Sequence, residues 1–159
     1  MSAYPLQNAL LNNLWPQNKS GEINITFDGG TADAIGDQSG TNNPYTLATV
    51  TGTVELVIIA TCTTNLVSAG GGSLEVGVAG ATAVLIAQST ATDIDAGEIW
   101  HDASPDAAVE VSTVITRKIV TKDVIMTVGT ADITAGVIKF DIFWNPISAN
   151  GKVVVGADA

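Results

Sequence analysis

The chain has 159 residues, a formal net charge of −10 and one cysteine, and it is long enough to bury a core without disulfide bonds. Twelve of its 16 carboxylates lie between Lys19 and Arg117, and no basic residue lies between those two. Such an acidic region repels phosphate backbones and anionic lipid head groups. Neither nucleic acid nor a membrane is therefore expected as a partner.

Residues 6–15 carry the pattern of an amphipathic helix. Pro5 suits its start and Pro16 its end, and Asn and Gln fill the face opposite the apolar stripe. Ten residues are too few for a helix that is stable alone in water, so the stripe must dock on something. The stripe could dock on its own domain or on a neighbouring subunit. The candidate interface consists of the apolar residues of the stripe, which are Leu6, Leu10, Leu11, Leu14 and Trp15.

The rest of the chain has the composition of β-structure, because Val, Ile and Thr supply 51 of the 159 residues. A long loop rich in Gly, Asp and Asn is expected from Asp28 to Pro44, either functional, packed against a partner, or mobile. The expected strands cover residues 22–27, 53–61, 73–78, 82–88, 97–102, 108–115, 117–121, 123–129, 136–144 and 152–155. This pattern predicts an all-β fold, an antiparallel two-sheet sandwich or jelly roll of eight to ten short strands. An arm or short helix over residues 1–20 would precede a single β-sandwich domain over residues 21–159.

One heptapeptide occurs twice, at residues 93–99 and 132–138, with five of seven positions identical. Each copy follows one expected strand and opens the next. Its Asp can accept hydrogen bonds from loop amides, and its Gly can take the positive φ of a tight corner. Two equivalent structural corners are favoured over a binding role.

The acidic residues of the first copy and its surroundings are the best metal candidates, since Ca²⁺ accepts several carboxylates on a flexible loop. They are Asp93, Asp95, Glu98 and Asp102. Their spacing does not fit an EF-hand loop. The second copy has Thr134 and Val137 where the first has Asp95 and Glu98. No metal ligand is assigned, and whether this loop binds a cation stays open.

Catalytic residues are not predicted. His101 is the only histidine, and Asp102 and Ser104 beside it superficially suggest a triad. Adjacent side chains on a strand point to opposite faces, however, so Asp102 is not expected to orient the His101 ring. The apolar flanks of Cys62 predict a buried, inert thiol. No nucleophile elbow and no phosphate-binding loop is present, and no cofactor is expected.

Three segments carry a resemblance to a known class, namely residues 71–77 (Gly-Gly-Ser-Leu-Glu-Val-Gly), 87–100 and 130–138. With them, the run from Thr53 to Ala159 resembles the small β-sandwich virion proteins of tailed bacteriophages, the class of head decoration (cement) proteins and head fibres. The resemblance implies a non-enzymatic protein, commonly a homotrimer, that sits on the capsid exterior with the major capsid protein as partner. The chain shows no secretory signal, so synthesis in the host cytoplasm is expected.

Two alternatives remain open. A receptor- or glycan-binding module of a tail or head fibre would share the fold and should present a pocket with an exposed Trp100. A small hydrolase should bring two carboxylates together in a cleft, with Glu98 and Asp102 as the candidates.

Overall fold

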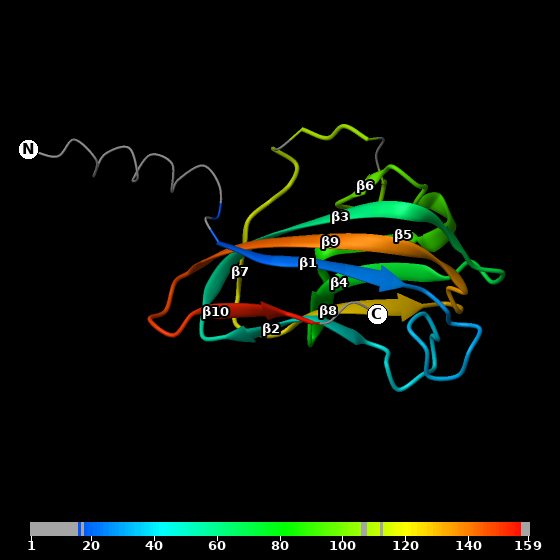
Figure 1. Ribbon diagram of the computed structural model, residues 1–159, viewed down its shortest axis with the longest axis horizontal. Coiled ribbons are helices and arrows are strands. Elements are labelled where there is room, and N and C mark those ends of the chain that lie inside the picture. Colours follow the sequence, from blue (N-terminus) through cyan, green and yellow to red (C-terminus); the bar gives the residue numbers. More distant parts are fainter. Residues whose placement is uncertain (1–15, 17, 106–107, 112, 157–159) are drawn as a thin grey trace, which may run out of the picture.

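A computed structural model describes residues 16, 18–105, 108–111 and 113–156. Two antiparallel sheets of five strands each pack face to face as a β-sandwich (Figure 1), which confirms the predicted fold class. The helical pattern of residues 6–15, with Leu6, Leu10, Leu11, Leu14 and Trp15, lies outside the described residues. Within the described ranges the one helical segment is a 3₁₀ turn, Ala91–Asp93.

No helix among those described residues is long and apolar enough to cross a membrane.

The first sheet is built around β3, the longest strand. Its strands follow the order β1, β9, β3 and β6, and β7 pairs with β3 on the same side as β6. Their bounds are β1 (Asn18–Thr26), β3 (Val54–Val67), β6 (Ile99–Trp100), β7 (Lys118–Val120) and β9 (Ala135–Pro146). β1 thus forms one edge of this sheet, and β6 and β7 form the other.

The second sheet follows the order β10, β2, β8, β4 and β5. Its strands are β2 (Tyr45–Thr51), β4 (Ser73–Val78), β5 (Ala81–Thr90), β8 (Val124–Gly129) and β10 (Lys152–Val155). β10 and β5 are its two edges, so each side of the sandwich has one edge strand from each sheet.

Alternation along the strands determines which side chains form the core. In β9, Ile138, Phe140 and Ile142 are fully buried, whereas Lys139 and Asp141 point to the outer face. The Trp100 ring meets Phe140 edge-on, with centroids 6.4 Å apart. This geometry is a favourable one for two aromatic rings.

The predicted strand over residues 108–115 is wrong. The described residues 108–111 and 113–115 contain no strand, and Val109 and Val111 are 85% and 60% exposed. Alternating valines form a β-strand only when a neighbouring strand pairs with them. This segment connects β6 to β7, and its described residues pair with no strand. The strand predicted at 97–102 is likewise reduced to Ile99–Trp100.

No strand is predicted over residues 45–52, although β2 occupies most of them. The register of β2 on β8 shifts between Thr46 and Ala48, and Leu47 and Ala48 are buried in succession. Such a bulge breaks the period of two on which strand prediction depends. Bulges also accompany the extension of β3 to Val67, six residues past its predicted end.

Both copies of the repeated heptapeptide lie at corners between strands, as predicted, although they bond to β3 through different positions. Gly97 and Gly136 have φ of +96° and +116°, and Ile94 and Ile133 are fully buried. Both corners lie against the last third of β3. The Gly97 N–H donates to the carbonyl of Cys62, and the Thr134 N–H donates to that of Val67.

Candidate interaction surface

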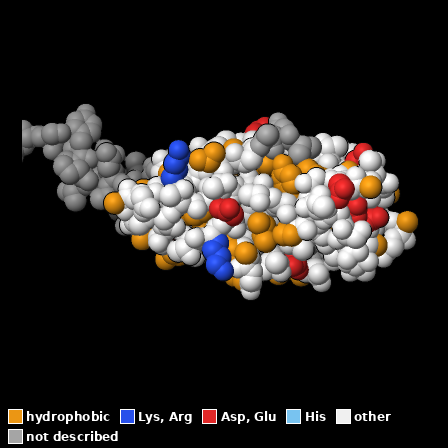
Figure 2. Space-filling model, turned by 90° about the horizontal axis from the view of Figure 1, so that it is seen from below, with side chains coloured by type: hydrophobic (Ala, Val, Ile, Leu, Met, Phe, Trp, Pro, Cys, Tyr) orange, Lys and Arg blue, Asp and Glu red, His pale blue; other side chains and the backbone are white. Residues whose placement is uncertain are grey.

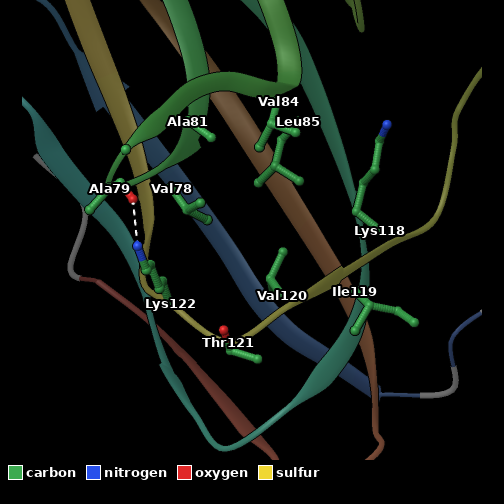
Figure 3. A pocket seen from close by; sticks show the side chains of 11 residues that line it. Val78, Ala79, Ala81, Val84, Leu85, Lys118, Ile119, Val120, Thr121 and Lys122 are labelled. Atoms are coloured by element: carbon green, nitrogen blue, oxygen red, sulfur yellow. Dashed lines mark hydrogen bonds between the residues drawn. The ribbon is translucent and has the colours of Figure 1, made fainter.

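The two sides of the sandwich differ in how they are covered. On one side β1 lies against β10, and the Ser20 hydroxyl donates to the Val153 carbonyl at 3.1 Å. On the other side, the edge strand β5 and the segment 118–122 leave a groove of about 350 Å³ between the sheets (Figure 3). It is lined by Val78, Ala79, Gly80, Ala81, Val84, Leu85, Lys118, Ile119, Val120, Thr121 and Lys122.

The groove has an apolar floor and an apolar rim. Val78 and Leu85 are partly buried and pack against the core, and Val120 is 6% exposed. On the rim, Val84 and Ile119 are 44% and 68% exposed. An apolar rim around a concave, apolar surface makes this groove a candidate contact site.

A basic side chain connects the walls at one end of the groove. Lys122 follows β7, and its Nζ donates to the Ala79 carbonyl in the turn between β4 and β5 at 2.9 Å (Figure 3). Lys118 stands at the other end of the same wall. The groove therefore has an apolar centre and a cation at each end.

The apolar surface continues beyond the groove. A small hollow of about 20 Å³ shares Leu85 and Lys118 with the groove and is also lined by Val114. The Val114 N–H donates to the Val111 carbonyl, which brings these two exposed valines into one turn. We call the exposed residues along this side the open-edge surface, and they are Val84, Val111, Val114 and Ile119.

Charge is separated along the long axis of the molecule. At the end that carries the two corners and the loop 28–44, seven carboxylates gather, namely Asp28, Asp33, Asp37, Asp93, Asp95, Glu98 and Asp132. Sheet register places Lys118 and Lys152 toward the opposite end, where the groove lies. Figure 2 shows most of the acidic side chains of one face toward one end and its basic side chains in the other half. The groove thus lies in the more basic half of an acidic protein.

His101 lies between two carboxylates, only one of which is adjacent to it in sequence. Its Nε2 is 2.9 Å from Oε2 of Glu110, and its Nδ1 is 3.5 Å from Oδ2 of Asp102. Asp102 was expected on the opposite face from His101, but the strand ends at Trp100, so its alternation no longer applies and the Asp102 carboxylate comes near the ring. The His101 and Glu110 side chains are 7% and 9% exposed. This cluster therefore joins two parts of the segment between β6 and β7.

The carboxylates proposed as metal candidates do not converge. Glu98 accepts the Asp95 N–H at 2.8 Å, and Asp102 accepts the Ser104 N–H at 2.7 Å. Across the described ranges, no three His, Cys, Asp or Glu residues are placed so that they could hold a metal ion. Asp132, in the second corner, accepts the Gln38 N–H at 2.8 Å, so its carboxylate fixes a loop.

The loop 28–44 packs on its own sandwich. Asp37 accepts N–H groups from Asp33 and Ser39 at 3.0 and 2.9 Å, and these hydrogen bonds lower the pKa of its carboxyl. Asn43 exchanges hydrogen bonds with both backbone groups of Val128 in β8. The carboxylates of this loop therefore satisfy backbone donors.

Three further sequence predictions meet the structure here. Cys62 is buried, and burial raises the pKa of its thiol to about 11, which keeps it protonated and inert as predicted. Trp100 is fully buried and donates its indole N–H to Ser89 at 2.7 Å, so the exposed Trp100 expected of a glycan module is absent. Glu98 and Asp102 do not line the groove.

Sequence reasoning missed both the groove and Glu110. Consecutive apolar residues at Val84, Leu85 and Ile86 signal a strand with an apolar outer face, and Ile119 beside Val120 repeats that signal. That these two runs face each other depends on the fold. Glu110 lies nine residues from His101 in an irregular segment, for which no periodicity predicts a contact.

No protein-family model, curated protein or solved structure matches this chain significantly.

Proposed function

We propose that this protein is a non-enzymatic structural protein of a tailed-phage virion, a capsid decoration (cement) protein that binds the outer capsid surface as a homo-oligomer, most simply a homotrimer, and stabilises the shell. The observation that carries this proposal is the open-edge surface. Two of its exposed residues, Val84 and Ile119, line a groove whose described lining includes no carboxylate and no histidine. Such a site suits packing against another protein surface.

The sequence resemblance gains support from the arrangement of its three segments. Ser73, in the first segment, pairs with Thr90 of the second in sheet register. Its hydroxyl also lies 3.4 Å from that of Thr130, which begins the third segment. The three segments thus form one continuous end of the sandwich, although 52 residues separate the first from the third in sequence. The segments that carry the resemblance are therefore one structural unit of this chain, which supports the proposal.

The test is cosedimentation of the purified protein with empty tailed-phage shells that lack it. Saturable binding at a fixed number of copies per capsomer is expected, and excess unlabelled protein should displace a labelled sample. Bound protein should also raise the temperature at which the shell melts, because a ligand that binds only the assembled state stabilises it. Protein that stays in the supernatant, or that pellets without saturation, would refute the proposal.

A further inference from the structure

The groove between β5 and the segment 118–122 could bind an apolar segment of protein, and residues 6–15 of this chain have matching properties. We propose that the apolar stripe of residues 6–15 from a second copy of this chain fills the groove between β5 and the segment 118–122. The inference rests on the homo-oligomer part of the proposed function, and it names the contacting segment. The observations that lead to it are the dimensions of the groove, its position relative to β1, and the chemistry of the two surfaces.

The dimensions agree. One wall of the groove runs from Lys118 to Lys122, which is roughly 13 Å of extended chain. A helix over residues 6–15 would be about 15 Å long. A volume of about 350 Å³ falls at the lower end of the range in which proteins bury ligands, roughly 300–1,000 Å³. That space suits a few branched aliphatic side chains, which is what the stripe offers.

The chemistry of the two surfaces also agrees. Residues 1–17 contain no charged side chain, so no ion would be desolvated when the stripe enters the groove. Lys118 and Lys122 stand at its two ends, so a helix lying along the groove in either direction would place its carbonyl end near a cation. A cation near a helix C-terminus is favourable.

The position of β1 decides between the chain's own stripe and that of a neighbour. Pairing across the first sheet aligns Asn18, Trp144, Leu56 and Lys118 in one row. Asn18 is therefore about 14 Å, or three strand spacings, from the groove wall. Pro16, just before it, is buried. Trp15 lies three residues from Asn18 and its Cα can extend at most about 10 Å from it, so the stripe cannot lie along its own groove over its full length, and only its first residues could reach that groove.

A neighbouring copy removes that restriction. Its stripe reaches the groove as a whole, and each copy can give a stripe and receive one. A head-to-tail exchange of this kind closes into a ring when the rotation between copies allows it. Because every subunit uses its groove once, the open-edge surface is covered throughout the assembly.

Disulfide trapping provides the decisive experiment. The double variant L10C/V84C places one thiol on the stripe and one on the groove rim, and L10C/V154C is the matched control, because Val154 is 49% exposed on β10 at the other side. Native Cys62 is buried with a pKa of about 11 and does not compete. After mild oxidation, L10C/V84C should form disulfides between chains while the control does not. Disulfides only within one chain, no disulfides, or equal cross-linking in both proteins would each overturn the inference.

Light scattering supplies the second measurement. The native protein should have a mass that is a multiple of 16.2 kDa. Deletion of residues 2–15 and the substitution I119D should each weaken association by about tenfold or more, whereas V154D should not change it. Ile119 is 68% exposed, so I119D is expected to fold. A native monomer, or a deletion that leaves the mass unchanged, would also overturn the inference.

Shell binding separates this inference from the proposed function. Native protein that pellets with shells but gives no cross-link between chains would leave the capsid role standing and remove the stripe-in-groove contact. Cross-linked oligomers that ignore shells would leave the contact standing and remove the capsid role.

Discussion

The two glycines of the repeated corner should respond very differently to the same substitution. Gly97 and Gly136 occupy equivalent positions and both have φ above +90°. A Cβ added at Gly97 would meet no heavy atom within 4 Å. One added at Gly136 would lie 2.6 Å from the Asn65 carbonyl oxygen and 2.8 Å from the Leu66 Cα. Backbone atoms of β3 cannot move aside without disturbing its pairing with β9.

The magnitudes follow from these environments. G97A should cost only the strain of an alanine at positive φ, about 1–3 kcal/mol. G136A should add the cost of forcing atoms into a filled space, about a further 1–3 kcal/mol. Because domains of this size are stabilised by roughly 5–15 kcal/mol, G136A should remove a large share of the total.

Urea denaturation followed by tryptophan fluorescence measures both effects. The midpoint should fall for both variants at an unchanged slope, and it should fall clearly further for G136A. In thermal melts each kcal/mol should lower the Tm by about 2–4 °C. Equal shifts, or a larger shift for G97A, would contradict the interpretation that the second corner is pressed against β3 while the first is open.

Two further predictions concern polar groups. S89A should destabilise the fold by about 2–3 kcal/mol in urea melts, because Ser89 accepts the Trp100 N–H and donates to the Asp102 carbonyl; a W100F/S89A double-mutant cycle without coupling energy would argue against this. Burial raises the pKa of Asp141, but the hydrogen bonds and charges of Lys19 and Lys139 outweigh it and hold that pKa below its usual range. The ionised form therefore contributes stability that is present above about pH 4 and lost as the pH falls through the folded pKa. In D141N the free energy of unfolding should fall less steeply at acid pH than in the native protein. D93N, at an exposed site, should keep the native pH dependence. Equal pH dependence for D141N and the native protein would refute the assignment.

The strands that could be predicted are those with an undisturbed period of two. β4 and β9 alternate in sequence between apolar residues and mostly polar or small ones, and they were located to within two residues. The two corners could also be predicted, because a repeated Asp and Gly pattern between strands has few structural explanations. These strands and corners depend on residues that are close together in the sequence, and a sequence pattern records only such local relations.

The remaining features depend on which strands become edges. Val109 and Val111 alternate as in a strand, but no described strand pairs with them. In β2 the bulge at Leu47 and Ala48 interrupts the alternation, so the sequence pattern does not reveal this strand. The groove exists because β5 and β7 end their sheets on the same side of the sandwich. Strand order is a property of the whole chain, so no local pattern could have revealed it. The candidate interface of the stripe, in contrast, came from sequence alone and still awaits its test.

The way in which the edge strands of the two sheets are covered is relevant to the proposed assembly. Edge strands invite unwanted pairing unless something covers them. Here β1 and β10 lie against each other, while β5 pairs with β4 alone among the described strands and carries the exposed Val84. A net charge of −10 opposes non-specific association of whole molecules. An uncharged stripe adds no like charge to that repulsion, so a neighbour's residues 6–15 can meet the groove without an electrostatic cost. The charge that suppresses aggregation would therefore leave this contact available.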